Sequence, residues 1–361
     1  MPAFTLASLD GAALSVPLRD PFVIATARAF ATQSVVVTAR LATGEVGLGE
    51  GAALPPVTRE DQSAVLAAVA AAAERLTGAV IGSVDALTAI LDETAFASPV
   101  ARAGIESAIL DAVSKHAGVP LRELLGGEVG RTTRTLVTDI TIPILEQERM
   151  VTLAREWRAR GFTCFKVKVG KDMDADVRGL HAIHQAIPGA TFRIDANAAF
   201  SARQALHLAR EVERRGIAVE CYEQPCYAKD LDAMAEVTAA LEIPVIADES
   251  VANAEDLARV VAMRAADGIN LKLAKSGGPL ATFALGQRAR AAGLQLMTGG
   301  MVETRLGMTA AAHVVAALGG VEYVDLDTAW LLADDPFVGG YIEDGPRYTL
   351  VDAAGLGISA R

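Results

Sequence analysis

Five short apolar runs recur at nearly even spacing through the middle of the chain, at residues 164–169, 191–194, 218–222, 244–247 and 268–273. A charged residue stands at or just after the end of each run: Lys168, Asp195, Glu223, Asp248 and Lys272. The carboxylates are 28 (223 − 195) and 25 (248 − 223) residues apart, and the lysine follows after 24 (272 − 248). Segments of helical character separate the runs, which predicts βα units and a parallel sheet. Polar residues at the C-terminal ends of consecutive strands are typical of the active-site face of a barrel.

These strand-end residues predict a metal site with lysines beside it. Three carboxylates at one rim repel each other unless a cation lies among them, and oxygen-only ligands suit a hard cation, so we expect Asp195, Glu223 and Asp248 to bind one Mg²⁺ per subunit. Lys166 and Lys168 are two residues apart on one strand, so their side chains point to the same side. Like charge and loss of hydration disfavour the ammonium form, so lysines beside a divalent cation are expected to have a lowered pKa.

The motifs around these residues give the chain a family resemblance. They are Lys166-Val167-Lys168, Asp195-Ala196-Asn197, Glu223-Gln224-Pro225, Ala247-Asp248-Glu249-Ser250 and Asn270-Leu271-Lys272-Leu273. With them the chain resembles the enolase superfamily, in its muconate-lactonizing-enzyme-like branch, over essentially its whole length. Within that branch, Asp325-Leu326-Asp327 is similar to the Asp-X-Asp motif of dipeptide epimerases, whose two aspartates hold the α-ammonium group of the substrate.

The resemblance implies an α/β fold: a modified TIM barrel of the (β/α)7β type, with an α+β N-terminal capping domain completed by the C-terminal tail. The expected division is 1–127 for the capping domain, 128–328 for the barrel and 329–361 for the tail. The order of patterns in the first part agrees, since β-forming runs at 4–16 and 34–42 precede helical patterns at 60–76, 85–95 and 99–117.

Three barrel strands and one loop are predicted outside the central runs. The barrel is expected to begin near Thr132, with strands at 136–142, 294–298 and 321–324. The segment 19–33 lacks a periodic pattern, and the resemblance makes it a mobile loop that closes over the substrate.

The resemblance also implies roles for further residues. Lys168 and Lys272 would be the catalytic bases on opposite sides of the substrate's α carbon, with the remaining residues contacting the substrate: Thr141, Lys166, Gly300, Val302, Asp325 and Asp327. Two bases on two faces suit a 1,1-proton transfer through an enediolate, whereas a syn elimination needs one. Glu303 is expected to order its loop or to cap the helix that begins near Thr304.

Each assignment has a structural alternative. Thr141 is also a good strand former, Gly300 and Val302 fit an ordinary βα turn, and the Asp325–Asp327 pair fits a turn or a helix cap. Arg28 lies in the 19–33 segment, where epimerases of Ala-Glu carry an arginine that binds the substrate carboxylate, but aligning the flanking residues places that position on Ala27. An acidic side-chain preference is therefore not predicted.

The function expected from these features is Mg²⁺-dependent epimerization of dipeptides at the α carbon of the C-terminal residue, from L-Ala-L-Xaa to L-Ala-D-Xaa, with a leaning to apolar Xaa. That makes the chain an isomerase that acts on amino acid derivatives. Two alternatives remain: a cycloisomerase or o-succinylbenzoate synthase-like dehydratase of the same superfamily, and a catalytically silent binding barrel. The first alternative acts on substrates that lack an ammonium group, which leaves the Asp-X-Asp pair unexplained.

Composition limits the partners. The net charge of −11 disfavours nucleic acid and anionic membranes, and no apolar run reaches transmembrane length. The first residues lack the regions of a signal peptide, and three cysteines in 361 residues suggest a reducing compartment, so a cytoplasmic location is expected. The expected partner is a small dipeptide, and barrels of this family often associate into homo-oligomers. All five histidines fall in helical patterns, which argues against a histidine base.

Overall fold

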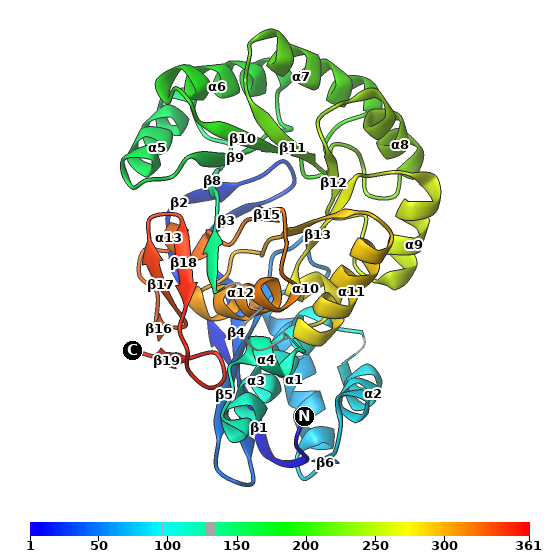
Figure 1. Ribbon diagram of the computed structural model, residues 1–361. Coiled ribbons are helices and arrows are strands. Elements are labelled where there is room, and N and C mark those ends of the chain that lie inside the picture. The colour runs from blue at the N-terminus through cyan, green and yellow to red at the C-terminus, as the bar shows by residue number, and fades with distance from the viewer. Residues whose placement is uncertain (96, 127–133) are drawn as a thin grey trace.

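Eight parallel strands curl around the centre of the computed structural model, which describes residues 1–95, 97–126 and 134–361 (Figure 1). In order they are β8 (Ile140–Ile142), β9 (Cys164–Lys168), β10 (Thr191–Asp195), β11 (Val219–Glu223), β12 (Val245–Ala247), β13 (Gly268–Leu271), β14 (Gln295–Thr298) and β15 (Tyr323–Val324). The amide of Asp139 donates to the carbonyl of Val324 (3.1 Å), which links the first strand to the last. The predicted α/β barrel is confirmed.

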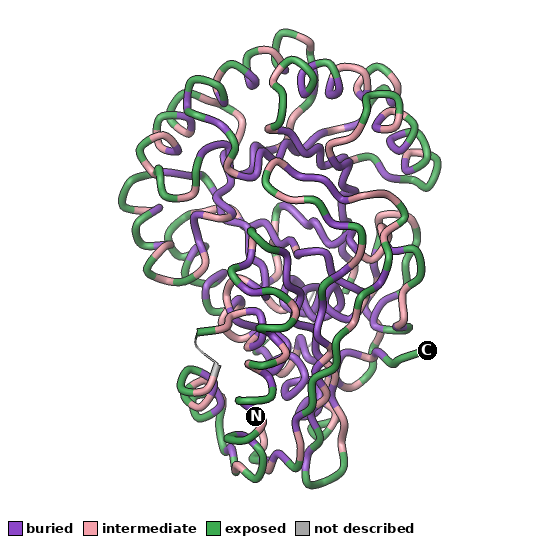
Figure 2. The backbone as a smooth tube through the Cα atoms, turned by 180° about the vertical axis from the view of Figure 1, so that it is seen from behind, coloured by how far each residue is buried: buried purple, intermediate pink, exposed green. Residues whose placement is uncertain are grey.

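Helices cover the outside of this sheet and leave its strands almost wholly buried (Figure 2). They are α5 (Gln147–Ala159), α6 (Met173–Ala186), α7 (Ala202–Arg214), α8 (Leu231–Ala240), α9 (Ala254–Met263), α11 (Pro279–Ala291) and α12 (Arg305–Leu318), with short helices α10 (Leu273–Ser276) and α13 (Thr328–Leu331). Local sequence sets several helix starts. Ser201 and Gln204 form a reciprocal capping box at α7, and Asn253 accepts two backbone N–H groups at α9.

The N-terminal part is an antiparallel sheet with helices packed on it, as predicted. Its strands, in spatial order, are β5 (Val46–Ala53), β4 (Gln33–Leu41), β1 (Phe4–Leu14) and β6 (Val80–Ile81), and its helices are α1 (Gln62–Leu76), α2 (Val84–Ala95), α3 (Pro99–Ala117) and α4 (Leu121–Leu124). Glycines on β5 allow α3 to approach closely. A Cβ at Gly47 would lie 2.0 Å from the Ala108 carbonyl oxygen, and one at Gly49 would lie 2.1 Å from that of Gly104.

The segment 19–33 is more ordered than its sequence predicted. Most of it belongs to an antiparallel hairpin of β2 (Pro17–Val23) and β3 (Arg28–Ala31), which reaches from the capping sheet to the barrel (Figure 1). The hairpin is attached to the barrel because the Arg149 guanidinium on α5 donates to both carboxylate oxygens of Asp20, at 3.0 and 2.7 Å. The weak sequence pattern gave no sign of these strands, which form because β2 and β3 pair with each other.

The predicted strand 136–142 is in fact two strands. β7 (Thr135–Val137) pairs with a strand of the C-terminal tail, and only β8 belongs to the barrel. The chain changes partner at Thr138, whose amide donates to the carbonyl of Pro346, while the next amide, that of Asp139, donates to β15. The expected start of the barrel near Thr132 lies outside the described residues.

The C-terminal tail contacts the capping helices. Its strands are β16 (Phe337–Gly339), β17 (Tyr341–Asp344), β18 (Arg347–Leu350) and β19 (Ile358–Ala360). The Leu356 amide donates to the carboxylate of Asp111 on α3 (2.7 Å), and Arg122 on α4 pairs with Asp352 (2.5 Å). The predicted boundary at 127/128 lies outside the described residues, so the exact division stays a prediction. No helix of the described residues is long and apolar enough to cross a membrane.

Candidate active site

The strand-end residues converge at one end of the barrel. Lys168, Asp195 and Glu223 are the last residues of β9, β10 and β11, and Asp248 and Lys272 directly follow β12 and β13. All five are buried, with the three carboxylates fully inaccessible to solvent. Three carboxylate-bearing strands separate the strands of the two lysines, so Lys168 and Lys272 lie on either side of the acidic group.

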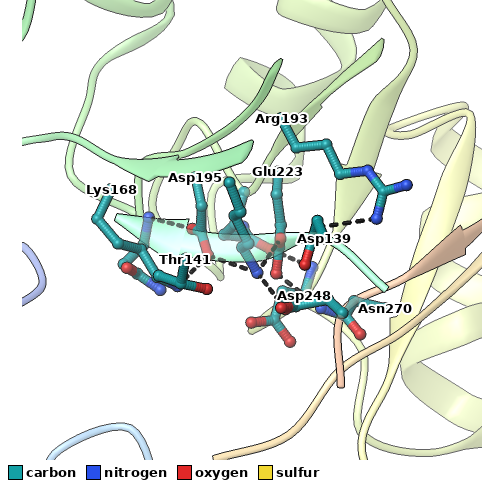
Figure 3. A network of polar contacts seen from close by, with 12 residues as sticks. Asp139, Thr141, Lys168, Arg193, Asp195, Glu223, Asp248 and Asn270 are labelled. Atoms are coloured by element: carbon teal, nitrogen blue, oxygen red, sulfur yellow. Dashed lines mark hydrogen bonds and ion pairs between the residues drawn. The ribbon is translucent and has the colours of Figure 1, made fainter. Parts of the chain in front are cut away.

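Each carboxylate is paired with an ammonium group. The Lys168 Nζ contacts Asp195 (Figure 3), at 2.5 Å from its Oδ2. The Lys272 Nζ lies 2.7 Å from Asp248 Oδ2. The Lys166 ammonium contacts three carboxylates rather than one.

The Lys166 Nζ lies 3.1 Å from Asp195, 2.6 Å from Glu223 and 2.7 Å from Asp325. The ammonium of Lys166 therefore joins the proposed metal ligands to the Asp-X-Asp motif.

The pairing controls the charge state of these groups. Burial alone lowers the pKa of Lys166, but Asp325, Glu223 and Asp195 outweigh it, so the pKa of Lys166 is raised well above its usual value. The carboxylate of Asp248 likewise outweighs the effect of burial on Lys272, so the pKa of Lys272 is also raised. Lys166 and Lys272 are thus held as ammonium ions by their carboxylate partners, and the lowered pKa expected beside a divalent cation stays a prediction.

The three carboxylates fit a hard divalent cation in chemistry. They offer only oxygen donors, and the Oε2 of Glu223 is buried with the Lys166 ammonium 2.6 Å away. The surroundings hold the other oxygens in place. Asn270 Nδ2 donates to Glu223 Oε1 (2.7 Å), and the Asn197 amide donates to Asp195 Oδ1 (2.9 Å).

A second group of carboxylates lies beside the first. Asp139, Asp325 and Asp327 are buried and offer oxygens within 4.8 Å of one another, a spacing suited to a divalent cation. The three predicted ligands do not form such a tight group among the described residues. Asp139 pairs with Arg193 (2.8 Å; Figure 3) and Asp325 pairs with Lys166, so two of the three members are already compensated by cations.

A cavity of about 20 Å³ lies between these groups and the capping domain. Its polar lining includes most of the residues expected at the substrate: Thr141, Lys166, Lys168, Lys272, Asp325 and Asp327. The wall supplied by the N-terminal part is entirely apolar and consists of Phe22, Ile24, Leu54 and Val57. The hairpin therefore lines this cavity with the hydrocarbon side chains of Phe22 and Ile24, and its predicted closure over the substrate stays a prediction.

The residues expected at the substrate differ in how they meet this cavity. Gly300 lines it together with its neighbour Met301, whereas Val302 is buried without lining it. The Thr141 amide donates to Asp327 Oδ2 (2.5 Å), while Asp327 Oδ1 has no hydrogen-bond partner among the described residues. Burial and the neighbouring Asp325 raise the pKa of Asp327 to about 7.

A larger cavity of about 270 Å³ adjoins the first and shares Phe22 and Thr141 with it. It lies between the hairpin, α5 and Leu331, and the Asp20–Arg149 ion pair forms part of its wall. It provides room next to the site on the side of the hairpin.

Two other sequence expectations concern nearby residues. Arg28 is exposed, and its guanidinium lies over the ring of Phe30 (4.7 Å to the centroid), so it does not line the cavity. Glu303 accepts from the Met301 amide (2.8 Å) and so orders its loop as expected, while Thr304 caps α12.

Sequence reasoning missed three groups of residues at the site. They are the apolar wall of Phe22, Ile24, Leu54 and Val57, the buried Asp139–Arg193 pair, and Lys275, whose ammonium contacts Asp248. Arg193 was detectable, because a charged residue at the centre of a buried barrel strand requires a partner. The apolar wall was not, because its residues come from distant segments.

Known proteins are similar to this chain over its whole length. Residues 11–126 match the family described as "Mandelate racemase / muconate lactonizing enzyme, N-terminal domain", and residues 149–361 match "Enolase C-terminal domain-like". The aromatic dipeptide epimerase of Herpetosiphon aurantiacus is 37% identical over 358 residues, which cover 98% of this chain and 99% of that protein.

Solved structures agree. A dipeptide epimerase from Enterococcus faecalis, complexed with Mg and the dipeptide L-Leu-L-Tyr, matches with a TM-score of 0.91 at 31% identity, covering 98% of this chain and 99% of that one. A muconate lactonizing enzyme from Pseudomonas fluorescens, complexed with muconolactone, has a TM-score of 0.93 at 28% identity, covering 99% and 97%. The fold alone therefore does not select the reaction, and the choice rests on the site.

Proposed function

The chain belongs to the mandelate racemase and muconate lactonizing enzyme group of the enolase superfamily, and from this premise we propose that it epimerizes dipeptides at the α carbon of an apolar C-terminal residue. One observation carries the proposal. Lys168 and Lys272 line the same small cavity from opposite sides of the carboxylates, and Asp325 and Asp327 line it too. This arrangement offers two bases for the carbon and an anionic anchor for an ammonium group.

Asp195, Glu223 and Asp248 would hold Mg²⁺, which when bound stabilises negative charge on the substrate carboxylate. Lys166, which already contacts two of these residues, would lie beside that carboxylate and add positive charge. The Asp139 group is the second candidate for the cation. Asp195→Asn and Asp139→Asn distinguish the two candidate metal sites, since only the substitution of a true ligand should abolish Mg²⁺ binding.

The proton transfer needs a base on each face of the α carbon. Lys168 would take the proton from one stereoisomer and Lys272 would return a different proton to the opposite face, and the two exchange roles in the reverse direction. For a lysine to act as the base it must be neutral, so it must leave its carboxylate partner when substrate and metal bind. The assignment predicts inversion in both directions by the same pair.

The anchor and the apolar wall define the substrate. Asp327 Oδ1 is buried without a partner among the described residues, which suits a donor such as the dipeptide's ammonium group. The wall of Phe22, Ile24, Leu54 and Val57 offers no polar partner to a side chain at the α carbon, and Arg28 points elsewhere. Both observations support an apolar rather than an acidic C-terminal residue, in keeping with the aromatic dipeptide epimerase of Herpetosiphon aurantiacus.

The test is ¹H NMR of L,L-dipeptides in D₂O with enzyme and Mg²⁺. We expect loss of the α-proton signal of the C-terminal residue and appearance of the L,D diastereomer, fastest for L-Ala followed by an apolar residue. Faster conversion of L-Ala-L-Glu would refute the side-chain assignment. No exchange with any dipeptide, in enzyme that binds Mg²⁺, would favour a cycloisomerase or a dehydratase instead.

A further inference from the structure

Lys275 has no part in the proposed proton transfer, yet its ammonium group contacts a proposed metal ligand. It lies on α10, three residues after Lys272, and its Nζ is 2.5 Å from Asp248 Oδ1. Its side chain is 10% exposed. A lysine buried to this degree needs hydrogen-bond or ion-pair partners, and the identity of these partners indicates its structural role.

Backbone carbonyls fix the Lys275 ammonium in place. It donates to the carbonyl oxygens of Asp248 (2.6 Å), Asn270 (2.9 Å) and Val251 (3.1 Å), in addition to the carboxylate. Four acceptors saturate a group that has three hydrogens. Since Asp248 and Val251 belong to the turn after β12 and Asn270 belongs to β13, Lys275 ties the turn that carries the ligand to the neighbouring strand.

A second side chain, that of Gln224 directly after β11, holds the same turn. The Gln224 Oε1 accepts from the amides of Asp248 (2.8 Å) and Ser250 (3.1 Å), and its Nε2 donates to the Ser250 hydroxyl (2.8 Å). The backbone on which Asp248 stands is therefore held on both sides, by an amide and by an ammonium group.

Lys272 contacts the same carboxylate in a different way. Its Nζ lies 2.7 Å from Asp248 Oδ2, and in the described part of the chain it donates to that carboxylate alone. Lys272 can leave Oδ2 without breaking any backbone hydrogen bond, whereas Lys275 cannot leave Oδ1 without losing three. The two oxygens of Asp248 thus have one exchangeable partner and one fixed partner.

We propose that Lys275 is a positioning residue for the metal site: it fixes Oδ1 and the turn of Asp248 so that Oδ2 is presented to the divalent cation. The inference rests on the proposed assignment of Asp248 as a ligand. A residue that orients a metal ligand in this way typically contributes a factor of about 10–100 to metal affinity. A lysine acting only through its charge would do the opposite, because an ammonium group repels the cation.

The two roles of Lys275 predict opposite changes in metal affinity when the lysine is removed, so a binding measurement distinguishes them. Mn²⁺ binding to the full-length protein, without substrate, is measured from the EPR signal of free Mn²⁺ for the wild type, Lys275→Met, Lys272→Met and the exposed control Lys229→Met. We expect Lys275→Met to weaken binding about tenfold. Lys272→Met, which removes a competitor for Oδ2, should not weaken it, and Lys229→Met should have no effect.

Unchanged or tighter Mn²⁺ binding in Lys275→Met would overturn the inference. If the wild type itself binds no Mn²⁺, the metal assignment falls and the inference falls with it. The result does not depend on which dipeptide is the substrate, so a failed epimerase assay beside the expected Mn²⁺ pattern refutes the proposed reaction alone.

A second variant guards against misfolding, because Lys275→Met leaves three carbonyls without a donor. Lys275→Gln keeps an N–H donor for these carbonyls but removes the charged contact with Asp248. Circular dichroism and urea unfolding establish that each variant is folded. Folded Lys275→Gln should still bind Mn²⁺ several-fold more weakly than the wild type, and wild-type affinity in this variant would refute the role of the Oδ1 contact.

Discussion

Replacing Glu303 by glutamine should stabilise the protein, and the gain should grow with pH. Glu303 is buried at the junction of the capping sheet and α12, where its Oε1 accepts from the Met301 amide and no cation pairs with it among the described residues. The Glu303 side chain fits there because residue 307 is a glycine: a Cβ at Gly307 would lie 2.1 Å from Glu303 Oε2 and 3.1 Å from Glu50 Oε2. Two carboxylates thus share one small buried space.

The two carboxylates differ in their surroundings. Burial raises the pKa of Glu50 too, but its hydrogen bonds oppose that shift. Glu50 accepts from the Ser34 hydroxyl, from the backbone and hydroxyl of Thr304, and from the Gly307 amide, which suits an anion at the N-terminus of α12. Glu303 has a single amide, so burial and the nearby Glu50 raise the pKa of Glu303 from 4.5 to about 8. Glu303 is therefore the member that carries a proton at neutral pH.

The direction of the change in stability with pH follows from proton linkage. Between pH 4.5 and 8 the folded protein keeps the proton on Glu303 while the unfolded chain has lost it, so stability falls as pH rises through this window. One pKa unit corresponds to about 1.4 kcal/mol, so from about pH 5.5 to about pH 7.5 the wild type should lose roughly 2.5 kcal/mol relative to Glu303→Gln. Glutamine resembles the protonated acid in shape and does not titrate, so other groups cancel in the difference.

Urea unfolding of both proteins at the two pH values measures this difference. The exposed Glu213→Gln is the matched control, and its effect should stay within about 0.5 kcal/mol at both pH values. If the difference between the wild type and Glu303→Gln is the same at both pH values, Glu303 is ionised in the folded state and the reasoning about the buried pair is wrong.

Further predictions test the site directly. Lys168→Ala and Lys272→Ala should each abolish inversion. Each variant should still exchange the α proton of one stereoisomer with solvent, and the stereoisomer should differ between the two variants. Retained epimerization in both would exclude the two-base scheme. Asp325→Asn should raise the KM for dipeptides about tenfold or more, from loss of a charged hydrogen bond, and change Mn²⁺ affinity far less; equal losses contradict the anchor role. Arg149→Met, which frees Asp20 on the hairpin, should raise KM at least about twofold but alter the free energy of unfolding by less than about 1 kcal/mol; an unchanged KM means that the pair does not hold the cover.

The barrel and the convergence of its charged residues were predictable because both depend on local order along the chain. A βα unit places the end of each strand at the same rim, so Asp195, Glu223 and Asp248 could be placed together from spacing alone. The break between β7 and β8 was not predictable in the same way. It depends on which strand the tail offers to residues 135–137, and that partner lies more than two hundred residues away in sequence.

The details of the site depend on long-range packing that a sequence does not display. The wall of Phe22, Ile24, Leu54 and Val57 is formed by two separate segments of the N-terminal part, and the hairpin that carries half of it shows little periodicity. Lys275 could not be separated from an ordinary helical lysine, because its partners are carbonyl oxygens whose positions follow from the turn after β12. The spacing of residues along the sequence predicts which residues lie together, whereas tertiary packing decides which of their atoms are fixed by hydrogen bonds.

Under the proposed assignments, Lys166 couples metal and substrate binding, because one ammonium group contacts both sets of ligands. It lies within 3.1 Å of Asp195, within 2.6 Å of Glu223 and within 2.7 Å of Asp325. A dipeptide ammonium that binds Asp325 takes over one of these partners and frees Lys166 to move toward the substrate carboxylate. That movement also releases oxygens of Asp195 and Glu223, the proposed metal ligands. Since coupling between two sites is reciprocal, occupation of the metal site must favour the dipeptide to the same extent as the dipeptide favours the metal.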